Sequence, residues 1–231
     1  SQTAHEQAHL ASALVFELSK VEHVYIRKAL VGHLRHIDED LAQRVAAGLA
    51  FDTMPAAPVA AMPVQEMAPS PALQIIGKMK DTLEGRAIGI LIADGSDSAA
   101  IKKIQQAAIK AGATVKIIAP KVGEVKLAGG SVLAADGQLA GTPSVLFDAV
   151  GVILSEEGAR ALSRESAAID FVRDAFGHLK AIAADAGGQA LLRQANIEHD
   201  AGIVDANDTD RFLAAAKTRQ WDREKSVRTL A

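Results

Sequence analysis

The stretch Gly85-Arg-Ala-Ile-Gly-Ile-Leu-Ile-Ala-Asp-Gly95 decides the fold of this sequence. Its apolar run from Ala87 to Ala93 ends at an Asp-Gly pair, and glycines stand on both sides of it. A short apolar run with such boundaries predicts a strand that is buried on both faces. Strands of this kind belong to parallel sheets covered by helices, so the stretch favours an α/β domain.

The residues that follow predict a helix and then a second strand. Apolar residues recur at helical spacing between 99 and 111, with lysines on the opposite side, and Gly112 stands where a helix ends. Residues 114–119 then form another apolar run. Strand, helix and strand in this order make a βαβ unit, which implies parallel strands and a right-handed crossover.

The same alternation continues to the end of the chain. We expect core strands at 149–154, 180–184 and 202–204, helices at 161–178, 188–196 and 208–218, and a hairpin from 124–127 and 131–135. This order predicts a doubly wound, mostly parallel, flavodoxin-like sheet. The charged tail from 219 to 231 is expected to be surface-bound or frayed.

Two different segments precede this domain. Residues 1–49 predict two or three amphipathic helices, whose apolar stripes are Leu10, Leu14, Leu18 and Val21, then Leu30, Leu34, Ile37, Leu41 and Val45. Residues 50–71 hold Pro55, Pro58, Pro63, Pro69 and Pro71, a density that excludes a helix or central strand. We expect a helical segment at 1–49, a Pro-rich linker at 50–71 and the α/β domain at 72–231; an ordered arm packed on a surface is the alternative for the linker.

Composition narrows the function classes. The net charge of −3 suggests neither nucleic acid nor an anionic membrane as a partner, and we find no apolar run long enough to span a bilayer. The 231 residues include no cysteine, which excludes disulfides, thiolate metal sites and cysteine nucleophiles. A chain without disulfides fits a cytoplasmic protein.

Polar residues are expected at the carboxyl ends of the predicted strands, where doubly wound sheets bind ligands. The turn Asp94-Gly-Ser-Asp-Ser98 could form a polar pocket at Asp97 that holds a phosphate or a substrate. It matches no phosphate-binding glycine motif, and a turn in which Asp97 or Ser98 caps the next helix is the simpler interpretation.

The turn at Ala183, Ala184 and Asp185 occupies the place of a nucleophile elbow in an α/β enzyme. It offers no thiol or hydroxyl, so the elbow is degenerate and Asp185 is interpreted as a helix-start or turn residue, although a carboxylate nucleophile is conceivable there. We therefore predict no catalytic residue. His5-Glu-Gln-Ala-His9 has the letters of a zinc-protease motif, but Thr3 and Glu6 have the spacing of a capping box, and we predict no metal site.

Several fragments together resemble the end of a monofunctional heme catalase of the large-subunit type. In the first part these are Phe16-Glu-Leu-Ser-Lys-Val21, Ile26-Arg27, His33-Leu34 and residues 37–46. In the second part they are residues 89–95, Ala111-Gly-Ala113, Ile118-Ala-Pro120, residues 143–149 and residues 178–182. The resemblance covers nearly the whole chain, and its second part implies a class I glutamine amidotransferase-like fold.

The resemblance implies that the parent enzyme dismutates hydrogen peroxide at a heme, as a homo-oligomer such as a tetramer. The heme ligands of that family have no counterpart here, and Tyr25, the sole tyrosine, stands in no heme-ligand motif. This chain is therefore expected to bind no cofactor itself, to be non-catalytic, and to have the catalase heme domain, on the same or another chain, as its partner. A chaperone-like holdase and a small-molecule hydrolase are the alternatives.

Overall fold

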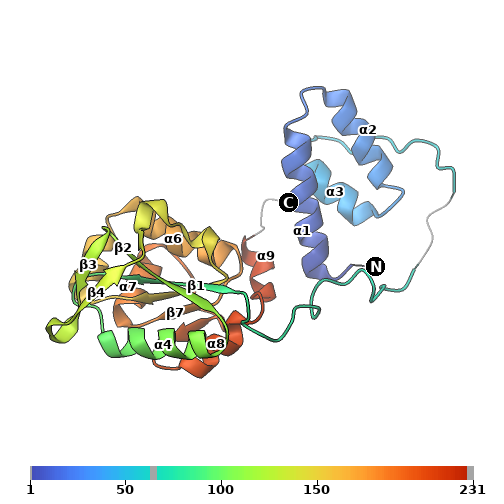
Figure 1. Ribbon diagram of the computed structural model, residues 1–231. Helices are drawn as coiled ribbons and strands as arrows, with labels where there is room; N and C mark the ends of the chain where they lie inside the picture. Colours follow the sequence, from blue (N-terminus) through green and yellow to red (C-terminus); the bar gives the residue numbers. More distant parts are fainter. Residues whose placement is uncertain (1, 63–66, 228–231) are drawn as a thin grey trace. The chain divides into compact units, whose positions relative to one another are not determined.

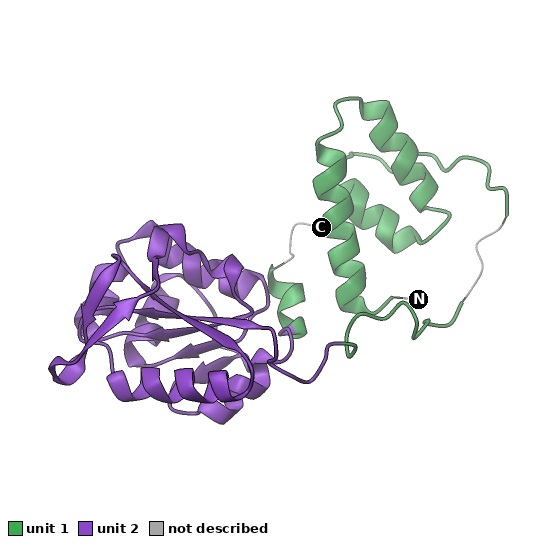
Figure 2. Ribbon diagram, viewed as in Figure 1, with its two compact units in different colours: residues 1–78, 221–231 green, residues 79–220 purple. Residues whose placement is uncertain are grey.

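The computed structural model describes residues 2–62 and 67–227. The chain forms two compact units, one from residues 1–78 with 221–231 and the other from residues 79–220 (Figure 2). The second unit begins later than the expected boundary at residue 72, because the turns before it bond to the helical unit: the Ile75 amide donates to Glu6 Oε1 at 2.6 Å.

A six-stranded sheet in the order β5-β2-β1-β6-β7-β8 forms the α/β unit, and every neighbouring pair is parallel. Its strands are β1 (Ala87–Ile92), β2 (Thr114–Ala119), β5 (Gly137–Gln138), β6 (Ala149–Ile153), β7 (Ile182–Ala184) and β8 (Ile203–Asp205). If the two-residue edge strand β5 is set aside, the order is the flavodoxin order, 2-1-3-4-5. The predicted fold class is confirmed.

Helices cover both faces of this sheet (Figure 1). Helices α4 (Ser98–Lys110) and α8 (Thr209–Ala216) pack on one face. Helices α5 (Glu156–Leu162), α6 (Ser166–Gly177) and α7 (Ala186–Gln194) pack on the other. Successive side chains of β1 point to opposite faces of the sheet. Ile88, Ile90 and Ile92 belong to the core cluster on the α4 and α8 face, and Leu91 belongs to the core cluster on the other face. Isoleucine, valine, leucine, alanine and phenylalanine make up both clusters.

The predicted hairpin is present. Strands β3 (Gly123–Lys126) and β4 (Val132–Ala135) pair antiparallel, and the turn between them holds Gly129 at a φ of +81°, which favours glycine. The hairpin bonds to the loop after β1, because the Lys126 amide donates to Asp94 Oδ1 at 2.9 Å and the Ala128 amide to the Ser96 carbonyl at 2.9 Å. Short 3₁₀ turns at Ala128–Gly130, Leu139–Gly141 and Ser144–Leu146 complete this region.

The region 161–178, predicted to be helical, contains the last two residues of α5 and the whole of α6, with a break at 163–165 that was not predicted. Ser155 starts α5 earlier than expected by accepting a hydrogen bond from the Gly158 amide at 3.0 Å. The tail is more ordered than a frayed end: Trp221–Arg223 forms a 3₁₀ turn, Glu224–Val227 forms α9, and Arg223 and Glu224 are buried. Residues 228–231 lie outside the described residues.

The other unit contains α1 (Ala4–Ser19), α2 (Val24–Leu34) and α3 (Glu39–Gly48), with a small core of its own. The predicted capping box of Thr3 and Glu6 is confirmed, and Asp38 caps α3 by accepting from the Leu41 amide at 2.8 Å. The apolar stripes are partly wrong. Leu10 is 43% exposed and Ile37 66% exposed, while small Ala11 lies fully buried among the helices in place of Leu10.

The proline-rich segment packs on these helices over part of its length. Arg35 Nη1 donates to the Pro55 carbonyl at 3.0 Å, and His36 Nε2 contacts the Pro58 carbonyl. A Cβ on Gly32 would lie only 2.5 Å from the Ala56 carbonyl oxygen, so a glycine permits this close approach. The structure therefore has an ordered arm at 55–58. Pro63 lies outside the described residues.

Candidate functional site

The loops after β1 and β6 meet where the strand order reverses, which is the usual ligand position in doubly wound sheets. Ser155 Oγ donates to the Asp94 carbonyl at 2.8 Å, and buried Ser96 Oγ donates to the Ile153 carbonyl at 2.6 Å. Ser96 Oγ also accepts from the Ala93 amide at 2.9 Å. These hydroxyls tie the two loops together, so they are occupied by structural bonds.

Asp97 acts as the N-cap of α4. Its Oδ1 accepts from the amides of Ala99 at 2.8 Å and Ala100 at 3.4 Å, which is the simpler interpretation of the Asp94–Ser98 turn. The side chain is exposed and lines neither of the two hollows described below.

Asp185 follows β7 and begins α7, at the position of the degenerate elbow. Its Oδ1 accepts from the Gly188 amide at 2.7 Å, and its Oδ2 accepts from the Leu154 amide at 3.0 Å. Burial raises the pKa of this carboxyl, and the negative charge of Asp97 adds to the effect, while the two amide hydrogen bonds oppose it. The carboxylate therefore stabilises the turn by accepting amide hydrogen bonds from the start of α7 and from the end of β6.

Two glycines let α7 start directly against the end of β6. A Cβ on Gly187 would lie 2.1 Å from the Leu154 carbonyl oxygen, and a Cβ on Gly188 would lie 2.2 Å from the Val152 carbonyl oxygen. Real side chains are not found at such distances, so the backbones can approach this closely only with glycine at both positions.

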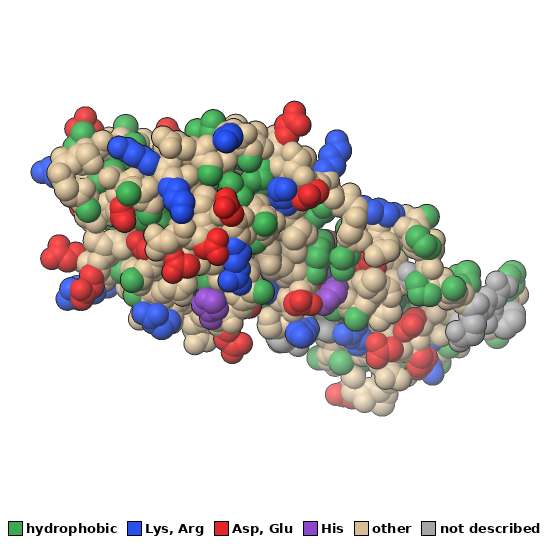
Figure 3. Space-filling model, turned by 90° about the horizontal axis from the view of Figure 1, so that it is seen from below, with side chains coloured by type: hydrophobic (Ala, Val, Ile, Leu, Met, Phe, Trp, Pro, Cys, Tyr) green, Lys and Arg blue, Asp and Glu red, His purple; other side chains and the backbone are tan. Residues whose placement is uncertain are grey.

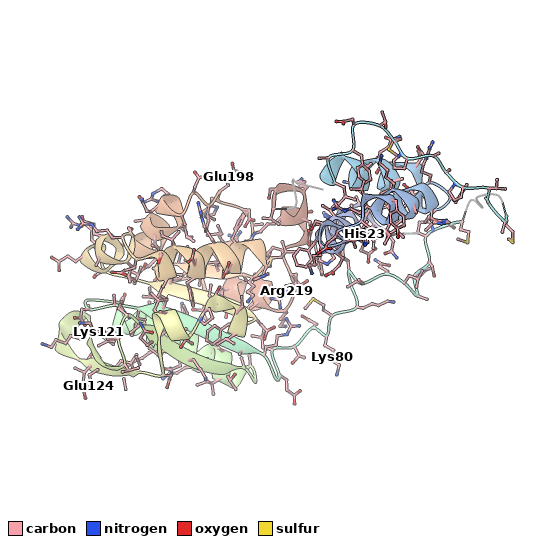
Figure 4. All side chains as sticks on the ribbon, turned by 90° about the horizontal axis from the view of Figure 1, so that it is seen from above. His23, Lys80, Lys121, Glu124, Glu198 and Arg219 are labelled. Atoms are coloured by element: carbon pink, nitrogen blue, oxygen red, sulfur yellow. The ribbon has the colours of Figure 1, made fainter. Side chains whose placement is uncertain are left out.

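A hollow of about 360 Å³ lies between the end of β1, the hairpin and α5. Its lining includes the charged residues Asp94, Lys121, Glu124 and Glu157. The other lining residues are small or apolar: alanine, glycine, proline and valine. Lys121 and Glu124 lie at the opposite end of the α/β unit from Arg219, which bonds to Asp148 just before β6 (Figure 4). On the face seen in Figure 3, acidic and basic side chains are interspersed.

A larger groove, of about 1030 Å³, runs between α5 and α7 and ends at Asp185. The sequence analysis missed its arginines, Arg160, Arg164 and Arg193. Two signals in the sequence could have pointed to these arginines. Arg160 and Arg164 lie four residues apart, which is the spacing of one helical face. Helices that follow neighbouring parallel strands also tend to lie side by side, which brings Arg193 near them.

The side chains of the zinc-like motif contact other groups of the helical unit. Glu6 is bound to the Thr3 amide at 2.8 Å as well as to Ile75, and these backbone bonds lower its pKa. His5 Nε2 lies 3.6 Å from Asp222 and His9 Nδ1 lies 3.6 Å from Glu224, so the two imidazoles face different carboxylates. Within residues 2–62 and 67–227 we find no group of three or more side chains arranged to hold a metal ion.

None of the helices in the described ranges has the length and apolarity needed to cross a bilayer.

The fold and the site define a doubly wound α/β domain with a capping carboxylate at the elbow position. The sequence matches the family described as "C-terminal domain found in long catalases" over residues 84–223, and the family "Catalase-related immune-responsive" over residues 1–49. The chain belongs to the long-catalase family, as a C-terminal region.

Named relatives agree with this assignment. The chain is 43% identical to "Catalase C" of Rhizobium meliloti (strain 1021) over 99% of its length, and 36% identical to "Catalase HPII" of Pseudomonas aeruginosa over 100%. It is 38% identical to "Catalase HPII" of Mycobacterium avium over 89%. These matches cover 33%, 33% and 28% of the three relatives, so the chain spans about a third of their length.

Proposed function

We propose that this chain is the C-terminal part of a large-subunit catalase whose whole protein dismutates hydrogen peroxide to water and oxygen. In this proposal the α/β domain is non-catalytic and supports assembly, stability or access to the heme domain. The observation that carries this role is the state of Asp185: both carboxylate oxygens accept backbone hydrogen bonds, which leaves no activated nucleophile at the elbow.

The position of Tyr25 does not fit the heme-ligating tyrosine of the family. Tyr25, the sole tyrosine, is 71% exposed on α2 and its ring lies against His23 at a centroid distance of 5.7 Å. An iron-ligating tyrosine needs an enclosed apolar site around the macrocycle, which an exposed ring lacks. We therefore assign the heme to the upstream part of the parent protein and derive no chemical step from it here.

The helical unit supports the heme domain as the partner. Large apolar side chains are exposed on α1 and α2: Phe16 at 62%, Val24 at 49%, Tyr25 at 71% and Ile26 at 40%. These exposed apolar side chains are the basis for the contact surface proposed here. We propose that residues 1–49 pack on the heme domain and that residues 50–71 connect the two parts. The appended domain, predicted at 72–231, has its compact α/β unit at 79–220. We also propose that the parent is a cytoplasmic homo-oligomer.

Hemin titration of the isolated chain tests the assignment of the heme. We expect no stoichiometric shift of the Soret band and no oxygen release from hydrogen peroxide. A saturable, one-to-one shifted band accompanied by turnover would contradict the proposal.

Size-exclusion chromatography tests the contact surface. The isolated chain is expected to self-associate through the exposed residues of α1 and α2, and Phe16→Ser with Tyr25→Ser should shift it toward the monomer. Val59→Ser is the matched control, because Val59 is fully exposed but lies on the proline-rich arm. Equal elution of all three proteins would argue against this surface.

Enzymatic assays separate the proposal from the hydrolase alternative. Without a thiol, and with Asp185 engaged in capping, we expect no hydrolysis of glutamine, peptides or glyoxal adducts. Hydrolysis that disappears in Asp185→Ala would favour the hydrolase instead.

A further inference from the structure

Two methionines of the proline-rich arm have their side chains largely in solvent. Met62 is 65% exposed and Met67 is 72% exposed, and both lie outside the helices and strands of the described ranges. Methionine side chains normally fill gaps in protein interiors, because the flexible thioether adapts to irregular packing. These two thioethers fill no such gap, so their sulfur atoms are open to small solutes.

The other two methionines of the chain have partly covered side chains. Met54 is half-buried and packs against the core of the helical unit. Met79 is also half-buried, and its sulfur accepts a hydrogen bond from Thr218 Oγ1 at 3.9 Å. A reagent that attacks sulfur must reach its lone pairs. The methionines therefore form two pairs that differ in access to the sulfur atom.

The surroundings of the exposed pair allow a change of polarity at the sulfur. Ala61 precedes Met62 and Ala68 follows Met67, and both alanines are exposed as well. A polar group on either sulfur would lie in water and would displace no packed side chain. Exposed segments of small residues are also the places where other enzymes gain access to a folded chain. Modification of these residues and its enzymatic reversal therefore require no unfolding.

We propose that Met62 and Met67 form a reversible oxidation site for hydrogen peroxide. A lone pair of the sulfur attacks one peroxide oxygen, so that an S–O bond forms as the O–O bond breaks. The proton on the attacked oxygen passes to the departing oxygen, which leaves as water. The sulfur is oxidised to the sulfoxide and the peroxide is reduced by the same electron pair. Methionine sulfoxide reductases, one for each sulfoxide epimer, restore the thioether.

The site goes beyond the proposed function, because no heme takes part in this reaction. Its two residues differ from Met54 in what oxidation does to the fold. A sulfoxide at Met62 or Met67 exchanges one solvated group for another, so the melting temperature stays unchanged. The same change at Met54 would place a polar group against the core of the helical unit and would disrupt its packing.

Peptide mass spectrometry of the full chain, sampled during treatment with excess hydrogen peroxide, tests this site. We expect Met62 and Met67 each to gain one oxygen atom at least about twofold faster than Met54 and Met79, as their larger exposed fractions imply. The melting temperature at that stage should equal that of the untreated chain, and the reductases with a thiol should then return both residues to methionine. An oxygen electrode in the same reaction detects any catalase turnover separately.

Methionine variants provide the controls. Met62→Leu combined with Met67→Leu should remove the fast phase of oxidation without changing the melting temperature, because both side chains are exposed. Met54→Leu is the matched control and should keep the fast phase. The proposal is overturned if Met54 or Met79 is oxidised as fast as the exposed pair. It is also overturned if oxidation confined to Met62 and Met67 lowers the melting temperature, or if the reductases leave their sulfoxides unchanged in the folded chain.

Discussion

The carboxylate of Asp185 lies 3.0 Å from the backbone nitrogen of Leu154 and accepts its hydrogen bond across neighbouring strands. The same side chain caps α7 through the Gly188 amide at 2.7 Å. One residue thereby joins the end of β6 to the start of α7. At this position the fold uses a carboxylate for stability, where an elbow enzyme uses a nucleophile for chemistry.

Replacing Asp185 tests this structural role. Asp185→Ala should lower the free energy of unfolding by roughly 2–3 kcal/mol, because it removes a helix cap and leaves the buried Leu154 amide without an acceptor. Asp185→Asn keeps one acceptor oxygen and should cost less than about 1 kcal/mol. Urea denaturation at pH 7 measures both. Equal stability of Asp185→Ala and the unmodified chain would show that the capping bonds contribute little.

The raised pKa of Asp185 predicts a pH dependence of stability. The folded state keeps the proton to a higher pH than the unfolded state, whose carboxyl has its ordinary pKa of 3.8. The folded state therefore binds more protons just above that value, and stability contributed by this group falls as the pH rises through the window. Urea denaturation between pH 4 and 7 should show this slope in the unmodified chain, and subtraction of the Asp185→Asn curve should isolate it.

Lys180 predicts the opposite slope in alkali. Burial lowers its pKa to about 8 from 10.5, and the charge of Arg219 adds to this, although Asp148 and Asp174 oppose it. Between these values the unfolded state binds more protons, so stability should rise with pH, by at most about 3 kcal/mol. Denaturation at pH 7.5 and 9.5 should show the rise in the unmodified chain and in Lys116→Met, whose lysine is exposed on β2, but a smaller rise in Lys180→Met.

The close approach of α7 to β6 predicts a sharp difference between two glycines. Gly188→Ala would place its Cβ 2.2 Å from the Val152 carbonyl oxygen and should destabilise the protein by more than about 3 kcal/mol. Gly177→Ala in α6 meets no atom within 4 Å and should be neutral or stabilising by up to about 1 kcal/mol. Thermal melts compare the two variants. Similar melting temperatures would mean that α7 can shift away from the strand at little cost.

The division of the chain predicts that residues 79–220 fold without the remainder. This segment contains the whole six-stranded sheet and both of its core clusters. We expect a cooperative thermal transition and a monomer in size-exclusion chromatography, whereas residues 1–78 should be marginal because their buried core is small. A truncated domain that melts without cooperativity would show that the helical segment is integral to the fold.

The sequence predicted the sheet well, because strands that are buried on both faces stand out as short, continuous apolar runs. Strand β2 was predicted residue for residue at 114–119, and β1 within one residue at its end. The helix at 161–178 was also predicted in the right place, but the start of α5 at Glu156 and the break at 163–165 were not predicted. Leu10 was assigned to the buried stripe of the first helix, but Ala11 is the fully buried residue of α1 and Leu10 is exposed.

The candidate site was predictable in position but only partly in content. The locations of Asp97 and Asp185 at strand ends follow from the βα order, and both prove to be helix caps. The second bond of Asp185, to Leu154, joins residues 31 positions apart, which no local pattern reveals. The arginines of the groove likewise come from segments far apart in the sequence, which meet only because α5 and α7 lie in contact.

The composition of the core has a consequence for chemical durability. Sulfur enters this chain only through Met54, Met62, Met67 and Met79, since it has no cysteine, and neither core cluster of the α/β unit contains a methionine. Thioethers and thiols are the groups that peroxides oxidise most readily, and methionine sulfoxide disrupts packed interiors. The interior around the sheet offers hydrogen peroxide neither target, so its packing is inert toward that oxidant.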